Sequence, residues 1–222
     1  PLSRITSCGE QMSSRDSKSF ARKAPRISPQ EKVLVYCEDT HSSLFYLRKA
    51  AQVFRASADV RIAHSGYTDP LGIVKSAIKS KAGYDHIYCV FDRDSHENFN
   101  AATALAREHK KYITLIISNP CFEYWYILHF GFTRRPYIRE GNRSSGDSAI
   151  RELKQKEGMN KYQKGDGSDI FNMLSERLED AERHAKQIFS IAKEYSEYNP
   201  STEVYKLIEK FRILGKPTES PP

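Results

Sequence analysis

Acidic side chains follow two apolar segments that the sequence predicts as strands. Glu38 directly follows the segment Lys32 to Cys37. Asp92 and Asp94 follow a second such segment, Asp85 to Phe91. A carboxylate at the end of a hydrophobic strand loses hydration, so it needs a cation or hydrogen-bond donors to compensate. Ligands of parallel sheets bind where the carboxyl ends of the strands meet. These three acids therefore predict a shared cation at that edge.

The chemistry of these acids favours magnesium or manganese. Mg²⁺ prefers oxygen ligands and usually keeps several waters, which leaves room for phosphate oxygens. Asp92 and Asp94 are two residues apart, so in an extended segment their side chains point the same way. The alternative is that Asp92 and Asp94 cap the helix expected from His96, while Glu38 pairs with a nearby base. The position of Glu38 after a second strand favours the metal site.

The segments around these acids alternate between strand and helix patterns. Short apolar strands separated by helices indicate βαβ units, and hence an α/β fold with a mainly parallel sheet and helices on both faces. The expected strands are Lys32 to Cys37, Val60 to Ala63, Asp85 to Phe91 and Tyr112 to Ile117. The expected helices between them are Ser42 to Phe54, Pro70 to Ser80 and His96 to Lys110.

A further acid, Glu123, lies in the aromatic segment Cys121 to Phe130, which predicts a buried helix after Pro120. A carboxylate in such surroundings must be paired, protonated or metal-bound. A structural hydrogen bond at the helix N-terminus is as good an interpretation as metal ligation. Glu123 is therefore a candidate site residue whose role stays open.

The polar segment 134–168 is basic, and it predicts a functional loop or insertion with one short helix near Asp147 to Lys156. Residues 134–165 contain nine basic and four acidic side chains, a local charge of +5. Such a cluster suits a polyanion, although a solvated basic surface explains it equally well. We expect phosphate contacts from Arg139, Arg143, Lys161 and Lys164. Lys164 could also stabilise charge that develops on a phosphate.

The C-terminal part predicts helices. From Asp169 to Tyr198, apolar residues recur every three or four positions, which is typical of one long amphipathic helix. Such a helix is longer than most small sheets can cover, so we expect part of its apolar stripe, including Leu178 and Ile188, to meet a second copy of the chain or another protein. The alternative is that the helix folds back over its own sheet. A final helix is expected from Thr202 to Leu214.

Composition sets the broad class. The chain has 222 residues and a net charge of +7, of which residues 1–30 contribute +4 from six basic and two acidic side chains. Its mean hydropathy is −0.65, and no apolar run approaches bilayer length, so we expect a cytoplasmic protein without membrane contact. The four cysteines form no C-x-x-C pair, which indicates reduced thiols. The predicted organisation is a disordered basic tail (1–30), an α/β core (31–133), a basic insertion (134–168) and C-terminal helices (169–222).

Several segments together resemble one family. They are CEDTHSSLFY at residues 37–46, YDHIYCVFDRDSHENF at 84–99, SNPCFEYWYILHF at 118–130, YQKGD at 162–166 and NPST at 199–202. From Lys32 to Phe211 the chain resembles the RloB-like proteins, a Toprim-related family linked to restriction and phage-defence loci. The combination of the SNPCFE and FDRD segments is specific to that resemblance.

The resemblance implies a Toprim-like core that binds Mg²⁺ or Mn²⁺. It implies that Glu38, Asp92 and Asp94 are the metal-binding acids and that Glu123 and Lys164 support catalysis. The sequence departs from the family pattern at one place, because Glu38 is followed by Asp39 and then Ser42, Ser43 and Leu44 where the family has Glu-Gly and a nearby Thr-Glu-Pro. The second glutamate of that pattern is absent, and Asp39 could partly substitute for it.

The expected function is therefore a metal-dependent endonuclease that cleaves RNA or DNA in antiphage defence or abortive infection. The resemblance also implies an ATPase partner of the ABC or AAA type, which agrees with the absence of a G-x-x-x-x-G-K-[ST] loop from this chain. A rival interpretation is a non-catalytic adaptor or sensor that binds metal and regulates the ATPase. A topoisomerase-like activity would need a nucleophilic tyrosine on a separate domain, for which the chain is short.

Overall fold

The computed structural model describes residues 31–93, 97–165 and 167–216, with only the backbone described at 167 and 168. Within them, five strands form one sheet in the order β2-β1-β3-β4-β5. The first four strands are parallel, and β5 is antiparallel to β4. The predicted α/β fold with a mainly parallel sheet is thus confirmed. The strands are β1 (Val33–Cys37), β2 (Val60–His64), β3 (His86–Asp92), β4 (Ile113–Asn119) and β5 (Ser201–Thr202).

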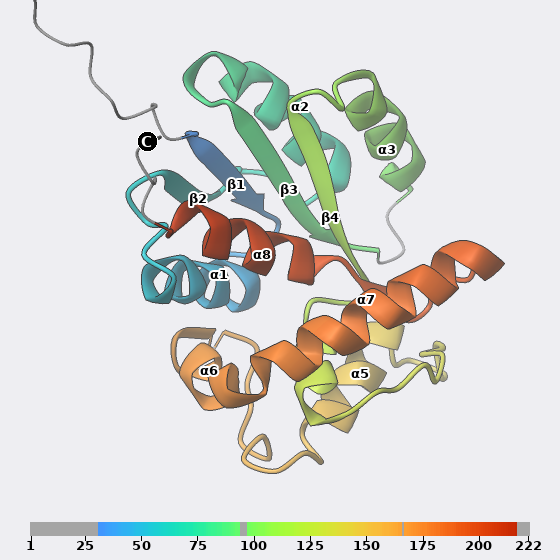
Figure 1. Ribbon diagram of the computed structural model, residues 1–222. Coiled ribbons are helices and arrows are strands. Elements are labelled where there is room, and N and C mark those ends of the chain that lie inside the picture. Colours follow the sequence, from blue (N-terminus) through green and yellow to red (C-terminus); the bar gives the residue numbers. More distant parts are fainter. Residues whose placement is uncertain (1–30, 94–96, 166, 217–222) are drawn as a thin grey trace, which may run out of the picture. The chain divides into compact units, whose positions relative to one another are not determined.

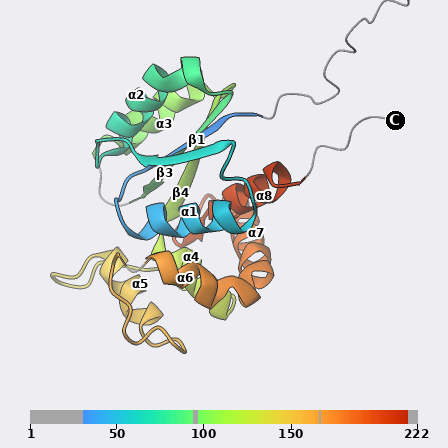
Figure 2. The ribbon, with the colours of Figure 1, turned by 90° about the vertical axis from the view of Figure 1, so that its left-hand side faces the viewer.

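Helices cover both faces of this sheet (Figures 1 and 2). Because side chains alternate along a strand, β1, β3 and β4 each contribute side chains to two cores, one on each face of the sheet. Leu34, Ile87 and Phe91 pack with α2 (Pro70–Ser80) and α3 (Phe99–Glu108), and the short 3-10 turn η1 (Lys81–Gly83) follows α2. Val35 and Val90 belong to the core on the opposite face, with α1 (Ser42–Val53) and α8 (Val204–Leu214).

The face with α1 and α8 carries a further layer of helices. Its aromatic side chains Tyr46, Tyr124, Trp125 and Tyr126 are completely buried. Burial of such large rings adds to the hydrophobic stabilisation of this face. The added elements are α4 (Glu123–Ile127), η2 (Leu128–Phe130), α5 (Ser145–Leu153), α6 (Gly167–Leu174), η3 (Ser175–Arg177) and α7 (Leu178–Tyr195). None of the helices in the described residues is long and apolar enough to cross a membrane.

Local sequence explains where several helices begin. Pro70 occupies the first turn of α2, and the Asp69 side chain accepts a hydrogen bond from the Gly72 backbone N–H at 2.9 Å. The expected helix from His96 begins instead at Phe99, with Asn98 as its N-cap. Asp92 therefore does not cap α3. Asp94 and His96 lie outside the described residues.

The prediction of one helix from Asp169 to Tyr198 is wrong. The segment is divided into α6, η3 and α7, because α6 packs on α1 whereas α7 packs on η2 and β5, and one straight helix cannot follow both surfaces. Leu178 is 6% exposed and Ile188 is 0% exposed, so both are buried in the chain's own core. The stripe therefore gives no support for a homodimer or an ATPase contact.

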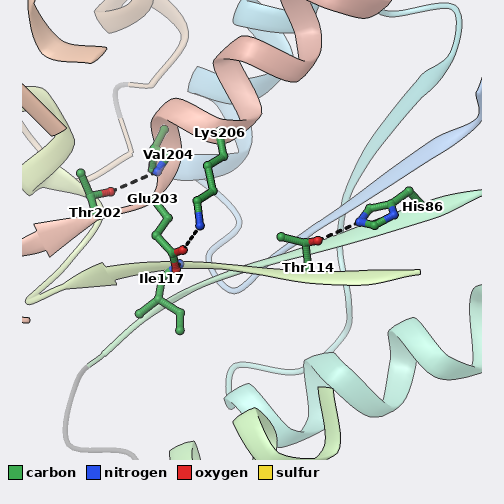
Figure 3. Close-up of polar contacts among 7 residues, drawn as sticks. All are labelled: His86, Thr114, Ile117, Thr202, Glu203, Val204 and Lys206. Carbon is green, nitrogen blue, oxygen red and sulfur yellow. Dashed lines mark hydrogen bonds and ion pairs between the residues drawn. The ribbon is translucent and has the colours of Figure 1, made fainter. Parts of the chain in front are cut away.

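The last helix also begins later than expected, at Val204, because Ser201 and Thr202 pair with the end of β4. The Thr202 hydroxyl lies 2.8 Å from that of Ser118. Glu203 continues the pairing, since its backbone N–H donates to the Ile117 carbonyl at 3.1 Å and its Oε2 accepts from the Ile117 N–H at 3.3 Å. Figure 3 shows this junction, with Lys206 on the Glu203 carboxylate and the His86 to Thr114 hydrogen bond farther along the sheet.

Candidate active site

The two strands that carry the predicted acids are neighbours in the sheet. Cys37 is in register with Val90, so the carboxyl ends of β1 and β3 meet. The Glu38 backbone N–H donates to the Val90 carbonyl at 3.0 Å, and the Asp92 backbone N–H donates to Glu38 Oε2 at 2.9 Å. The structure thus brings Glu38 and Asp92 together as the parallel topology predicts. Asp94, the third predicted ligand, lies outside the described residues.

A cavity of about 160 Å³ opens beside these acids. Its acidic side chains come from the ends of β1 and β3, and Lys164 comes from the loop before α6. Thr68, in the loop after β2, and Phe122, just before α4, complete its wall. Ligands of parallel α/β sheets bind at this edge. The full lining is Glu38, Asp39, Ser43, Thr68, Val90, Phe91, Asp92, Phe122 and Lys164.

The carboxylates in and around the cavity repel one another. Desolvation of its carboxyl raises the pKa of Asp92 well above the ordinary value, and repulsion from Glu123 and Glu38 raises it further, while Lys164 acts in the opposite direction. Burial lowers the pKa of Lys164, but attraction to Glu123 and Asp92 outweighs it, so the net pKa is raised. Lys164 is therefore a fixed positive charge, and the acids favour the uptake of a cation or a proton.

Glu123 lies at the start of α4 and is completely buried. Its Oε1 accepts a hydrogen bond of 2.9 Å from the Tyr162 hydroxyl. Its Oε2 has no hydrogen-bond partner in the part of the chain that the structure describes. A buried carboxylate oxygen without a partner is costly unless a proton or a cation compensates it. Glu123 is thus neither a pure helix cap nor a fully satisfied structural acid.

A chain of donors connects the Lys164 loop to Glu123. The Gly165 N–H donates to Ser42 Oγ at 3.2 Å, and Ser42 Oγ lies 3.3 Å from the hydroxyl of Tyr162, which donates to Glu123. Gly165 has a φ of +118°, a conformation that side chains disfavour, and it lies against His41. These contacts tie the loop to α1 and α4, and they hold Lys164 over the acids.

Asp39, which follows Glu38 at the end of β1, has a structural role. One oxygen accepts from the Ser43 hydroxyl at 2.6 Å, and the other accepts from the His41 N–H at 2.7 Å. The carboxylate therefore satisfies donors at the start of α1, as a helix cap does. Its expected substitution for the missing family glutamate stays a prediction.

The chemistry of the donors fits a hard divalent cation, since the cavity offers carboxylate oxygens and Glu123 adds a buried oxygen without a partner. The described residues contain no group of three or more His, Cys, Asp or Glu side chains close enough to hold a metal ion by themselves. Asp94, the third predicted ligand, lies outside the described residues, so its role beside Glu38 and Asp92 stays a prediction.

The four predicted phosphate contacts are not at one place. Arg139 precedes the exposed turn between Glu140 and Arg143, and Arg143 ends it. Lys161 lines a separate hollow beside Met173. Of the four, Lys164 is the side chain that lines the acidic cavity. The hydrogen bond from Tyr162 to Glu123 was not predicted, because a contact across 39 residues leaves no local pattern.

The fold and the cavity define an α/β protein with an acidic site at the carboxyl edge of a mainly parallel sheet, faced by a lysine. A family model described as RloB-like protein matches residues 33–211, and the chain belongs to this family. Comparison with curated proteins gave no significant match, and comparison with solved structures gave none either.

Proposed function

We propose that this protein is a metal-dependent endonuclease that hydrolyses phosphodiester bonds in RNA or DNA. The observation that carries the proposal is the hydrogen-bonded pair of strand ends, Glu38 and Asp92, in one cavity with Lys164. The resemblance of Glu38 and the FDRD segment to the acids of a Toprim domain supports the same activity. The proposed setting is antiphage defence with an ATPase partner, because the family resemblance implies both. The absence of a G-x-x-x-x-G-K-[ST] loop from this sequence agrees with this setting.

The charged residues in and around the cavity have different roles in this proposal. Glu38 and Asp92, with Asp94, would hold Mg²⁺ or Mn²⁺. When bound, the ion supplies Lewis-acid chemistry at the scissile phosphate and lowers the pKa of a water. Lys164, whose ammonium stays charged, stabilises the negative charge that grows on the phosphate oxygens. Tyr162 orients Glu123, whose negative charge acts on Asp92 and Lys164.

The first test replaces Asp92 with Asn. The change keeps the size of the side chain but removes its charge, and we expect cleavage to fall by about 100-fold or more, the scale on which one electrostatic group acts in catalysis. Asp85→Asn is the matched control, because Asp85 precedes the same strand at its other end and an amide oxygen can still accept from the Lys32 N–H. Cleavage of end-labelled RNA and DNA is measured with the partner ATPase, with Mg²⁺ and with chelator.

Three outcomes would contradict the proposal. Asp92→Asn could cleave as fast as the wild type, or chelator could have no effect. The third is a wild-type protein that binds nucleic acid and its ATPase partner but cleaves neither RNA nor DNA, and this result would favour the adaptor.

A further inference from the structure

A second hollow, of about 340 Å³, lies at the same edge of the sheet as the acidic cavity. It is formed where the end of β3, the helices α3 and α7 and the junction of β5 with α8 come together. Its lining combines arginines and aromatic rings, which neither the predicted metal site nor the predicted phosphate contacts use. The side chains that matter here are Arg93, Phe99, Arg107, Phe189, Tyr198 and Glu203.

The hollow and the acidic cavity share one peptide. Asp92 lines the cavity and the next residue, Arg93, lines the hollow. Consecutive Cα atoms are about 3.8 Å apart, so the two spaces meet at this peptide although the two side chains leave it in opposite directions. The Arg93 N–H donates to the Ser118 carbonyl at 2.7 Å, which fixes this peptide against β4.

The hollow presents positive charge that is available to a ligand. The Arg93 guanidinium lies 5.0 Å from the centre of the Phe99 ring, and Arg107 is exposed in the last turn of α3. Neither arginine forms an ion pair with a carboxylate of the described residues. The acidic side chain in the lining, Glu203, is paired with Lys206. The hollow therefore suits an anion such as a phosphate.

Two aromatic rings border the same hollow. Phe189 of α7 and Tyr198 have ring centroids 6.1 Å apart, and both side chains are half-buried. Proteins bind single-stranded nucleic acid with aromatic rings beside basic side chains, because bases stack on the rings while the cations contact the backbone. A base inside a duplex cannot reach such a platform without leaving the stack.

We propose that this hollow binds the nucleotide that flanks the scissile phosphate of a single-stranded RNA or DNA substrate. Arg93 and Arg107 contact its phosphate, and its base stacks on Tyr198, while Phe189 supports the Tyr198 ring. The inference rests on the proposed nuclease function, which it deepens by naming the strandedness of the substrate and a second binding place. The hollow would thus provide phosphate contacts at this edge of the sheet, where Arg139 and Arg143 do not line the hollow.

The test measures binding in the Asp92→Asn protein, by fluorescence anisotropy of short labelled RNA and DNA, each as a single strand and as a duplex, at several salt concentrations. In that background, Arg107→Gln should lower the slope of log affinity against log salt by about 0.7, the value of one phosphate contact on a single strand. Lys110→Gln is the control, because Lys110 is an exposed basic side chain just after α3 that does not line the hollow.

Stacking is tested in the same assay. Tyr198→Ala should weaken binding by about 5- to 150-fold, the equivalent of one stacked base. Tyr195→Ala, at a ring that is 63% exposed and outside the hollow, should leave the affinity unchanged. RNA and DNA are compared in parallel, and the one with the larger Tyr198 effect is assigned as the substrate class.

The outcomes separate this inference from the proposed function. If the wild type cleaves but Arg107→Gln and Tyr198→Ala bind like their controls, the hollow is not a nucleotide site and the nuclease proposal stands. If the duplex binds as tightly as the single strand in every variant, the inference is also wrong. If the wild type neither binds nor cleaves nucleic acid, both proposals fail.

Discussion

The two faces of the sheet are built differently. On the face of α2 and α3, the core is aliphatic apart from a few aromatic rings and the thiol of Cys89, and its buried side chains are small or branched, as Ile73, Val74 and Ala102 illustrate. On the face of α1, α4 and α8, the core contains four fully buried Tyr and Trp rings. The fully buried acid Glu123 and the buried His129 belong to the helices of that second face, whereas neither α2 nor α3 contributes a buried polar side chain in the described residues.

The two faces therefore differ in the free-energy cost of burying polar groups. Apolar burial is what stabilises the core of the α2 and α3 face, and its side-chain hydrogen bonds, such as Tyr36 to Ser80, lie at the partly exposed margin. On the other face each buried polar group needs a partner, because an unsatisfied one costs about 1 to 3 kcal/mol. Tyr162 for Glu123 and the Trp125 carbonyl for His129 are such partners. The candidate active site is therefore found on the face whose packing is the more demanding.

The largest effect on the free energy of unfolding is expected at Trp125, which is completely buried on the aromatic face. Trp125→Ala removes the indole and leaves a cavity, so the free energy of unfolding should fall by about 3 to 5 kcal/mol. Denaturant unfolding followed by circular dichroism measures it. A loss below about 1 kcal/mol would mean that the aromatic layer is not a tightly packed core.

A pH effect of intermediate size should appear on the same face. Burial lowers the pKa of His129 to about 4 from its ordinary value, although hydrogen bonds to backbone carbonyls act in the opposite direction. Between about pH 6.5 and pH 4, the imidazole of His129 is protonated in the unfolded chain but mostly neutral in the folded chain. The free energy of unfolding should therefore fall by about 3 kcal/mol as the pH drops from about 6.5 to about 4. Unfolding of the wild type and of His129→Asn across this range gives the difference.

The Asn variant keeps a side-chain N–H for the Trp125 carbonyl but cannot titrate. We therefore expect a flatter pH dependence for it than for the wild type. His184→Asn is the control, because His184 is half-buried and bonded to the Leu128 carbonyl in the same region. Parallel curves for the wild type and His129→Asn would show that the buried imidazole does not distinguish this face.

The smallest effect is expected on the aliphatic face. Ile73 of α2 is completely buried, and Ile73→Val removes one methylene, so the free energy of unfolding should fall by about 0.5 to 1.5 kcal/mol at every pH between 4 and 7. The same unfolding series measures it. A cost that changes with pH would contradict the separation of the two faces.

Much of this arrangement follows from local sequence. Continuous apolar runs predict β1, β3 and β4 because strands buried on both faces need no polar alternation, and Pro70 predicts the first turn of α2. The approach of Glu38 to Asp92 follows from the parallel topology. These features depend on residues close together in the chain or on a general rule of sheets.

The parts that could not be predicted depend on distant contacts. Apolar spacing continues from Leu174 to Leu178, so the sequence does not reveal the break at η3, which arises because α6 and α7 pack on different surfaces. The two-residue strand β5 is too short to leave a pattern, and it forms because β4 offers its edge. The bond from Tyr162 to Glu123 likewise depends on how α1, α4 and the Lys164 loop meet.

The single peptide between Asp92 and Arg93 also restricts the length of β3. Side chains alternate along a strand, so the insertion or deletion of one residue in β3 would exchange the two faces. An arginine would then enter the acidic cavity, and a carboxylate would face Phe99 and Arg107. Length changes in this chain are therefore tolerable in the exposed turn between Glu140 and Arg143, but not between His86 and Arg93.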